Sequence, residues 1–272
     1  MDTLDAFLSW ARDEELSGQP DAEAAAGELG HVVRRIADAA GAIDAAVIDI
    51  GSGTGAVALA MADRRIPAVA VDVNEDAVAR GRAVATRLNA PVTHVAGDAT
   101  ALPFRDASFG GSVHRSVLVY LEDRPRAVAE ERRVLAAGAM VSCSESIGAA
   151  VDLSTEEPGI AEVWPALREV LTEAAAHALW PSELARLYRE AGFTDVRVVT
   201  EDRETALDSS AAVVRAFAVP PPAGLSAREY WRRAGLPGEV VDEFLARLAR
   251  EAELDRPVRL ATQEAFLTAT AP

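Results

Sequence analysis

Two periodicities of apolar residues alternate along the first part of the chain. Short apolar runs with the length and composition of buried strands occupy residues 45–50, 68–73, 92–97, 109–114 and 139–145. Between them, apolar residues at helical spacing predict helices from the glycine-rich stretch after residue 50 to about Asp63, over 74–89 with Asn74 as N-cap, and over 123–138 with Gly138 as its end. Strands that alternate with helices predict a mostly parallel sheet covered on both faces. In such sheets ligands bind at the carboxyl ends of the strands.

The alternation of strands and helices is absent from the first 40 residues and becomes irregular after residue 146. Helical spacing predicts helices over 2–16 and 21–40, and after residue 146 two irregular segments surround a helix and strand over 181–200. We therefore divide the chain into an N-terminal helical lid (1–42), a core (43–146), a cap insertion (147–181), a core helix and strand (182–205), a second cap insertion (206–257) and a last core strand (258–272). If the lid closes over the core, Phe7 and Trp10 would line its entrance.

Large aromatic side chains are concentrated in the two insertions. They are Trp164, Trp180, Phe217, Tyr230, Trp231 and Phe244. Such a group suits an apolar pocket for a planar substrate. It suits equally well a small cap that needs a hydrophobic core of its own. The sequence leaves both interpretations open.

Composition excludes several classes of protein. A net charge of −16 over 272 residues argues against a nucleic-acid partner, which needs a basic surface. One cysteine, Cys143, and four scattered histidines predict no disulfide and no metal site. No apolar run reaches about 18 residues and the N-terminus is acidic, so we expect a cytoplasmic protein without a membrane partner. All basic residues are arginine, which excludes lysine-based phosphate binding or Schiff-base chemistry.

The glycine-rich loop after the first strand is the candidate cofactor site. "GSGTGA" (51–56) fits both the dinucleotide pattern GxGxxA and the pattern GxGxG. Asp72, at the end of the second strand, follows Gly51 by 21 positions and is placed to bind ribose hydroxyls. The loop alone does not decide between a dinucleotide and another adenosine cofactor.

Residues further along the chain separate these two possibilities. "AGDATALPFRDASF" (96–109) and "HRSVLVYLEDRPRAVAEERRVLAAGAMVS" (114–142) follow the loop in order. Together with it they resemble the class I S-adenosylmethionine-dependent methyltransferases, in the ubiquinone/menaquinone-biosynthesis-like (type 11) branch. The resemblance covers residues 45–146 well and extends weakly to "AGFTDVRVV" (191–199) and the final "EAFLTA". It departs at Ala136-Ala137-Gly138, where the family has Pro-Gly-Gly, and at Gly110-Gly111.

The resemblance implies a fold and a cofactor. The fold is a Rossmann-like, doubly wound, mostly parallel seven-stranded sheet with an antiparallel last strand, here with helical cap insertions. The cofactor is S-adenosyl-L-methionine, released as S-adenosyl-L-homocysteine. Its implied binding residues are Asp49, Gly51, Ser52, Gly53, Gly55, Asp72, Val73, Asp98, Ala99, His114 and Arg115, with Ala99 and Leu102 flanking the adenine.

The reaction expected on this scaffold is in-line methyl transfer to an oxygen, nitrogen or carbon atom of a small organic molecule, which we expect to be a specialised metabolite. Candidate catalytic residues are His114, Arg115, Tyr120 and His177. Histidine could serve as a general base and arginine could hold an anionic group. No Asn/Asp-Pro-Pro-Tyr/Phe motif of DNA-amine methylation follows the fourth strand, and one cysteine is too few for arsenite methylation.

Three alternatives remain open. The cofactor could support a non-methylating reaction such as a cyclisation on the same fold. An NAD(P)-dependent oxidoreductase would use the same glycine loop, although a Tyr-x-x-x-Lys pair is absent and the run at 96–142 would be unexplained. A non-enzymatic cofactor-binding subunit is the third. The protein is expected to be a monomer or a homodimer.

Overall fold

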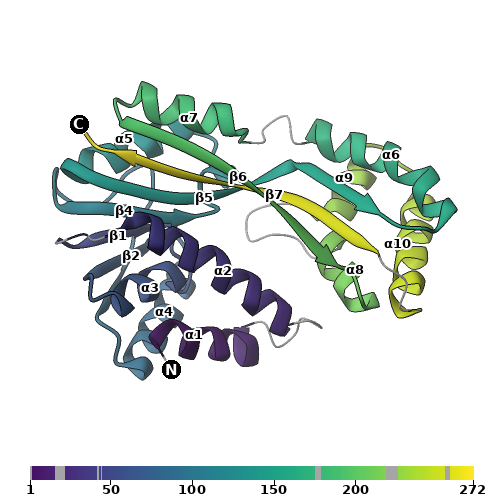
Figure 1. Ribbon diagram of the computed structural model, residues 1–272, viewed down its shortest axis with the longest axis horizontal. Helices are drawn as coiled ribbons and strands as arrows, with labels where there is room; N and C mark the ends of the chain where they lie inside the picture. Colours follow the sequence, from purple (N-terminus) through teal and green to yellow (C-terminus); the bar gives the residue numbers. More distant parts are fainter. Residues whose placement is uncertain are drawn as a thin grey trace.

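A seven-stranded sheet forms the centre of the protein (Figure 1). The computed structural model describes residues 2–15, 22–41, 43, 45–174, 179–218, 226–254 and 258–272. The strands are β1 (Val47–Ile50), β2 (Ala68–Asp72), β3 (Val92–Ala96), β4 (Phe109–Arg115), β5 (Leu135–Ser154), β6 (Thr194–Ala206) and β7 (Arg259–Thr270). Their order across the sheet is β3-β2-β1-β4-β5-β7-β6. β1 to β5 pair in parallel, whereas β7 is antiparallel to both β5 and β6. This confirms the predicted fold class.

The helices lie either against the two faces of the sheet or in a second lobe. They are α1 (Thr3–Trp10), α2 (Ala22–Ala40), α3 (Ala56–Asp63), α4 (Glu75–Leu88), α5 (Arg124–Val134), α6 (Pro158–Ala174), α7 (Pro181–Glu190), α8 (Ser210–Phe217), α9 (Ala227–Arg233) and α10 (Gly238–Glu253), with short helical turns η1 (Ala11–Glu15) and η2 (Leu118–Tyr120). α1 to α4 lie on one face and α5 and α7 on the other (Figure 1). The strand order reverses between β1 and β4, so the loops after these strands border the site at which doubly wound sheets bind ligands.

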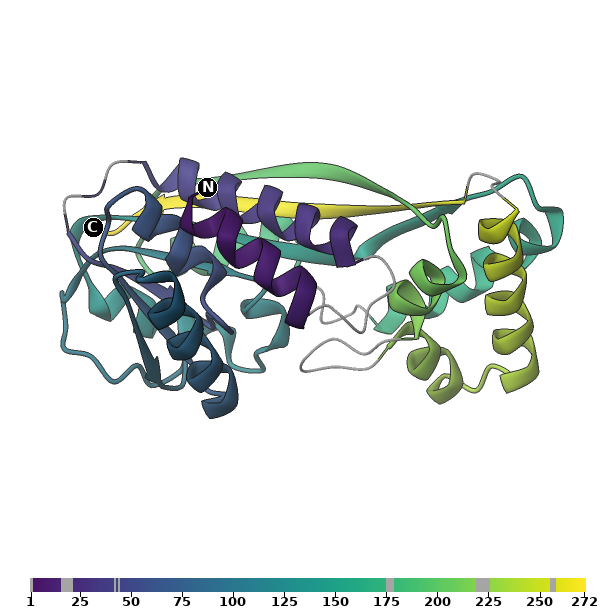
Figure 2. The ribbon, with the colours of Figure 1, turned by 90° about the horizontal axis from the view of Figure 1, so that it is seen from below.

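A second lobe lies beyond the carboxyl ends of the parallel strands. β5 and β6 run out of the core into it and β7 returns from it, as Figures 1 and 2 show. α6, α8, α9 and α10 pack there around a separate hydrophobic cluster that includes Leu153, Trp164, Phe217, Trp231 and Phe244. The two insertions therefore share one small core, built on three strands that also belong to the main sheet.

The helix predicted over 123–138 is shorter than expected, which corrects that boundary. α5 ends at Val134, and Leu135 already pairs with Phe109 of β4. Gly138, with φ 78°, lies inside β5, and its N–H donates to Ala271 O. The C-terminal residues thus recruit 135–139 into the sheet, and this long-range pairing overrides the local helix signal.

Paired glycines in β4 are required by close packing. A Cβ on Gly111 would lie 2.6 Å from Ile43 Cδ1 and 3.0 Å from Met140 O. We expect Gly111→Ala to lower the free energy of unfolding by about 1–3 kcal/mol through overpacking. Gly27→Ala is the control, because a Cβ there meets nothing within 4 Å. It should be neutral or stabilising by up to about 1 kcal/mol, since alanine favours a helix. Urea unfolding followed by circular dichroism measures both, and equal stability of the two variants would contradict this assignment.

The first helix is fastened to the core. Backbone N–H groups of Thr3 and Leu4 donate to the Asp63 carboxylate at 2.8 and 2.7 Å. Phe7 is fully buried, and Trp10 packs on it and beneath the Arg87 guanidinium. Phe7 therefore belongs to the core and does not line an entrance, which corrects that expectation. Within the described ranges, every helix is too short or too polar to cross a membrane.

Candidate functional site

The loop between β1 and α3 bends through three glycines in the left-handed backbone region. Gly51, Gly53 and Gly55 have φ of 61°, 54° and 93°, a region that glycine enters without steric cost. A Cβ on Gly51 would lie 2.6 Å from Val117 Cγ2, and one on Gly55 would lie 2.6 Å from His94 Nε2. A Cβ on Gly53 would meet no atom within 4 Å. Neighbouring side chains thus close on the first and third glycines, while the middle one faces open space.

Asp72, the last residue of β2, ties this loop to the next one. Its Oδ2 accepts the Gly53 N–H at 2.7 Å and its Oδ1 accepts the Asn74 N–H at 2.8 Å. Asn74 in turn caps α4 by accepting N–H groups of Asp76 and Ala77. A carboxylate has about four acceptor positions, so each oxygen of Asp72 keeps capacity for a ligand hydroxyl.

Asp49 in β1 is buried at the base of the loop. Its Oδ2 accepts the Ala58 N–H of α3 at 2.9 Å. Asp49 Oδ1 and Ser52 Oγ are buried, and neither finds a hydrogen-bond partner in the described part of the chain. Burial raises the pKa of Asp49 to about 7. Buried polar atoms without partners are rare in native proteins, and they suit a site where a ligand supplies the missing donors.

The loop after β3 presents a third acid. Asp98 Oδ1 accepts the backbone N–H and the hydroxyl of Thr100 at 2.7 and 2.8 Å. These hydrogen bonds lower the pKa of Asp98. Val73, at the start of the β2–α4 loop, is 74% exposed. Ala99 is half-buried, and the Leu102 side chain is buried in the hydrophobic core.

Arg115 and Tyr120 lie at the carboxyl end of β4. Arg115 is exposed, and Tyr120, on η2, is 39% exposed. Burial raises the pKa of Tyr120, and the positive charge of Arg115 opposes that rise. Arg115 also acts electrostatically on Asp49. Both side chains are thus accessible near the glycine loop.

His114 points the other way, into the protein. Its side chain is 2% exposed, and Nε2 lies 2.8 Å from the hydroxyl of Tyr188 on α7. Burial opposes its charged form, but Cys143 and the carboxylates of Glu145 and Glu131 raise the pKa of His114 well above its ordinary value. With 2% of its side chain exposed, the imidazole is not accessible to a substrate. The geometry therefore gives no support to His114 as general base or as a cofactor contact.

The remaining predicted residues are His177 and the aromatic residues of the two insertions. His177 lies outside the described residues. Of the aromatic side chains in the insertions, Trp164, Phe217, Trp231 and Phe244 are buried against one another, while Trp180 is 44% exposed. Those four form the core of the second lobe, and this favours the second of the two interpretations of the aromatic residues.

Sequence reasoning missed Glu145, which is fully buried in the middle of β5. It accepts the backbone N–H groups of Val117, Leu118 and Val119 at 3.0, 3.0 and 3.2 Å. A signal was present, because Glu145 is an acid near the end of an apolar strand, as Asp49 and Asp72 are. Its partners were not predictable, since they come from another strand's loop.

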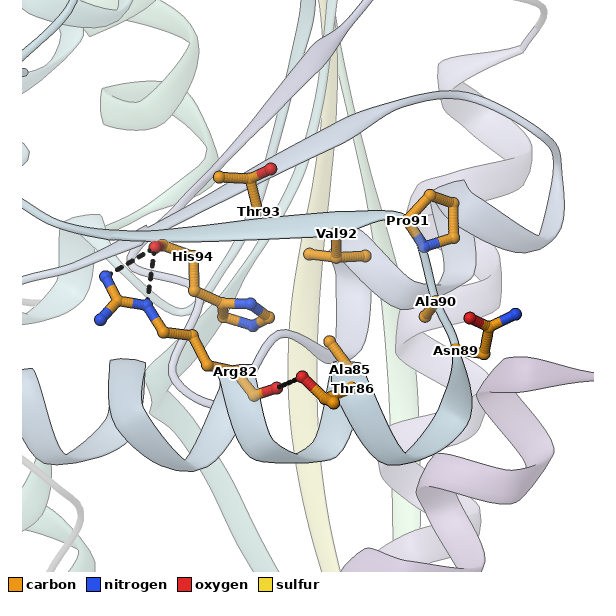
Figure 3. A pocket seen from close by; sticks show the side chains of 9 residues that line it. All are labelled: Arg82, Ala85, Thr86, Asn89, Ala90, Pro91, Val92, Thr93 and His94. Atoms are coloured by element: carbon orange, nitrogen blue, oxygen red, sulfur yellow. Dashed lines mark hydrogen bonds between the residues drawn. The ribbon is translucent and has the colours of Figure 1, made fainter.

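A depression between α4 and β3 meets the glycine loop only through His94, whose Nε2 would lie 2.6 Å from a Cβ on Gly55. It is lined by Arg82, Ala85, Thr86, Asn89, Ala90, Pro91, Val92, Thr93 and His94 (Figure 3). The Arg82 guanidinium closes one side by donating twice to His94 O, at 3.1 and 2.9 Å. None of the predicted cofactor or catalytic residues borders this depression, so it is not the candidate site. Within the described chain, no group of three or more His, Cys, Asp or Glu side chains is arranged to hold a metal ion.

Comparison with known proteins identifies methyltransferases as similar sequences. Residues 48–143 match a family model described as a methyltransferase domain. A malonyl-[acyl-carrier protein] O-methyltransferase from Geobacter sulfurreducens is 36% identical over 124 residues, 44% of this chain and 46% of that protein. A demethylmenaquinone methyltransferase from Renibacterium salmoninarum is 33% identical over 113 residues, 41% of this chain and 46% of that protein. The chain thus spans about half the length of the curated relatives that it matches.

A solved structure supports the fold over most of the chain. The crystal structure of a putative methyltransferase from Bacillus halodurans superposes with a TM-score of 0.58 at 19% identity, covering 88% of this chain and 98% of that one. At this identity the likeness concerns the fold alone.

Proposed function

We propose that this protein transfers a methyl group from S-adenosyl-L-methionine to a small organic acceptor, because residues 48–143 match the methyltransferase domain family. The observation that carries the proposal is the left-handed glycine loop joined to Asp72 by the hydrogen bond from Gly53. This arrangement brings backbone N–H groups, the Asp72 carboxylate and the unpaired oxygen of Asp49 together at the carboxyl ends of the strands.

The residues present fit this cofactor. S-adenosylmethionine has no phosphate, so an acidic chain without lysine is suited to it. Asp72 would accept the ribose hydroxyls, and Asp98, exposed and fixed by Thr100, would accept the adenine amino group. Asp49 Oδ1 and Ser52 Oγ would face the methionine portion, whose ammonium group supplies the donors that Asp49 lacks. Val73 and Ala99 offer the apolar surface for the adenosine.

The chain's own residues would position and shield the reaction. When bound, the cofactor would supply an electrophilic methyl group: the acceptor atom would form a bond to the methyl carbon as the carbon–sulfur bond breaks, and the bonding electrons would leave with sulfur as a neutral thioether. Proximity, alignment and exclusion of water then provide most of the acceleration. Arg115 and Tyr120 are accessible beside the loop and would orient the acceptor, with Arg115 favouring an anionic group. His177 remains a candidate for the acceptor side.

The acceptor is proposed to bind between the sheet edge and the second lobe. Both long insertions lead to this lobe, which stands beyond the carboxyl ends of the strands (Figure 2). The curated relatives are named for a malonyl-acyl-carrier-protein and a demethylmenaquinone. These differ from each other, so they support an organic acceptor without selecting one. A specialised metabolite and a cytoplasmic location are part of this proposal.

Calorimetric titration with S-adenosylmethionine, S-adenosylhomocysteine and NADH tests the cofactor. We expect dissociation constants on the order of micromolar for the first two and no heat with NADH. Asp72→Ala should weaken binding by about tenfold or more, because a hydrogen bond to a charged group is lost. Asp76→Ala is the matched control, an exposed acid in the first turn of α4.

Two results would contradict the proposal. Binding of NADH in place of the sulfonium compounds would indicate an oxidoreductase, and no binding at all would remove the cofactor. Product analysis with candidate acceptors then separates methyl transfer, which yields S-adenosylhomocysteine, from a cyclisation, which consumes no cofactor.

A further inference from the structure

A chain of buried polar side chains runs along the sheet face that α5 and α7 cover. Its members are Ser112, Glu131, Tyr188, His114 and Glu145, each less than 3% exposed. Ser112 and Tyr188 both donate hydroxyl protons to Glu131, the latter at 2.7 Å. The Tyr188 oxygen then accepts from His114 Nε2 at 2.8 Å. The chain therefore leads from α5 through α7 to the carboxyl end of β4.

Glu145 ends this chain at the candidate site. Its Oε1 lies 3.3 Å from His114 Nδ1, which makes no hydrogen bond within the described residues. Three consecutive backbone N–H groups, from Val117 to Val119, point at the same carboxylate. Charge-assisted hydrogen bonds of this kind are stronger than neutral ones. Glu145 consequently fixes the start of the loop that carries Tyr120.

The loop held by Glu145 presses on the glycine loop. Val117 is 8% exposed, and its Cγ2 would lie 2.6 Å from a Cβ added to Gly51. Val117 thus occupies the space that the missing side chain of the first glycine leaves. Arg124 Nε donates to Leu118 O at 2.9 Å and holds the loop from the other side. The backbone position of 117–119 therefore determines how tightly Val117 packs against Gly51 of the glycine loop.

We propose that Glu145 is a positioning residue that docks the segment 117–119 on Gly51 and so sets the affinity of the glycine loop for its ligand. This inference rests on the proposed function for the identity of the ligand. The docking itself rests only on the contacts of Glu145 and Val117. His114 lies behind Glu145, with its Nδ1 3.3 Å from the carboxylate, and would stabilise that carboxylate when protonated.

Amide hydrogen exchange and calorimetry with S-adenosylhomocysteine test the docking together. In Glu145→Ala we expect the amides of 117–119 to exchange faster and the dissociation constant to rise, each by about tenfold or more, because charged acceptors of buried N–H groups are lost. Glu145→Gln keeps one acceptor oxygen and should recover part of both effects. Glu122→Gln, an exposed acid just past Tyr120, should change neither.

A second variant separates docking from general loss of stability. Val117→Ala removes the contact with Gly51 and leaves Glu145 in place, so affinity should fall while the amides of 117–119 stay protected. Unchanged affinity in both Glu145→Ala and Val117→Ala, or undiminished protection in Glu145→Ala, would overturn the inference. If the wild-type protein binds no S-adenosylhomocysteine, the proposed function fails, whereas protection lost only in the Glu145 variants would still support the docking.

Discussion

Trp231→Ala should unfold the second lobe and leave ligand binding by the core intact. Trp231 is fully buried, and its indole N–H donates to Leu167 O at 2.8 Å. Its ring stacks on Phe217 and meets Phe244 edge-on, each at 5.7 Å between centroids. Truncation of such a tryptophan costs about 3–5 kcal/mol. The lobe contains one small hydrophobic cluster, so its free energy of unfolding should be small compared with this loss.

Amide hydrogen exchange and ligand-binding measurements together distinguish unfolding of the second lobe from unfolding of the whole protein. We expect amides of α6, α8, α9 and α10 to lose protection, while the dissociation constant of S-adenosylhomocysteine stays within a factor of about two, because distant sites act independently. Methyl transfer should be lost, since the proposed acceptor site needs the lobe. Val240→Ala, an exposed apolar truncation on α10, is the control. Loss of S-adenosylhomocysteine binding together with the lobe would mean that the two parts fold as one unit.

Ligand binding should strengthen as pH rises toward 7. Burial raises the pKa of Asp49 to about 7, so below that pH the free protein carries a proton on this carboxyl. A ligand ammonium beside Asp49 favours the carboxylate, and binding then releases the proton. Affinity for S-adenosylmethionine should rise by up to about tenfold per pH unit below 7 and level off above it.

Titrations between about pH 5.5 and about pH 8.5, in buffers of different ionisation enthalpy, count the released protons. Asp49→Asn keeps an acceptor for the Ala58 N–H and should remove the release. The ligand's own amine contributes equally to both proteins and cancels in the comparison. Asp98 has a lowered pKa and His114 a raised one, so neither accounts for a transition near 7. The same pH dependence in Asp49→Asn would exclude Asp49 as its source.

Much of the core follows from local patterns. Apolar runs fixed the positions of β1 to β4 to within two residues at either end, and the glycines and Asp72 lie where the motif predicts them, joined by a hydrogen bond. These features depend on residues close in sequence, because a strand, a left-handed turn and a helix cap are each specified locally. The family resemblance predicted that the last strand is antiparallel, a direction that local patterns do not indicate.

Long-range contacts decided the rest. The alternation of side chains along a strand predicts that His114 and Arg115 face opposite sides of β4, but it does not predict which side is buried. α7, more than 70 residues later, brings Tyr188 to His114 and so makes Arg115 the accessible neighbour of the site. Likewise the aromatic residues of the insertions became a lobe core because both insertions meet at the ends of β5, β6 and β7.

The sequence by itself determined the class of sheet, the glycine loop and the acids at the strand ends, since these arise from neighbouring residues. Only the tertiary structure decided that the His114 side chain is buried, that α5 ends at Val134, and that Glu145 holds the loop beside Gly51. Each of these depends on which distant segments pair, and the pairing is set by the burial of whole faces and not by any one stretch of residues.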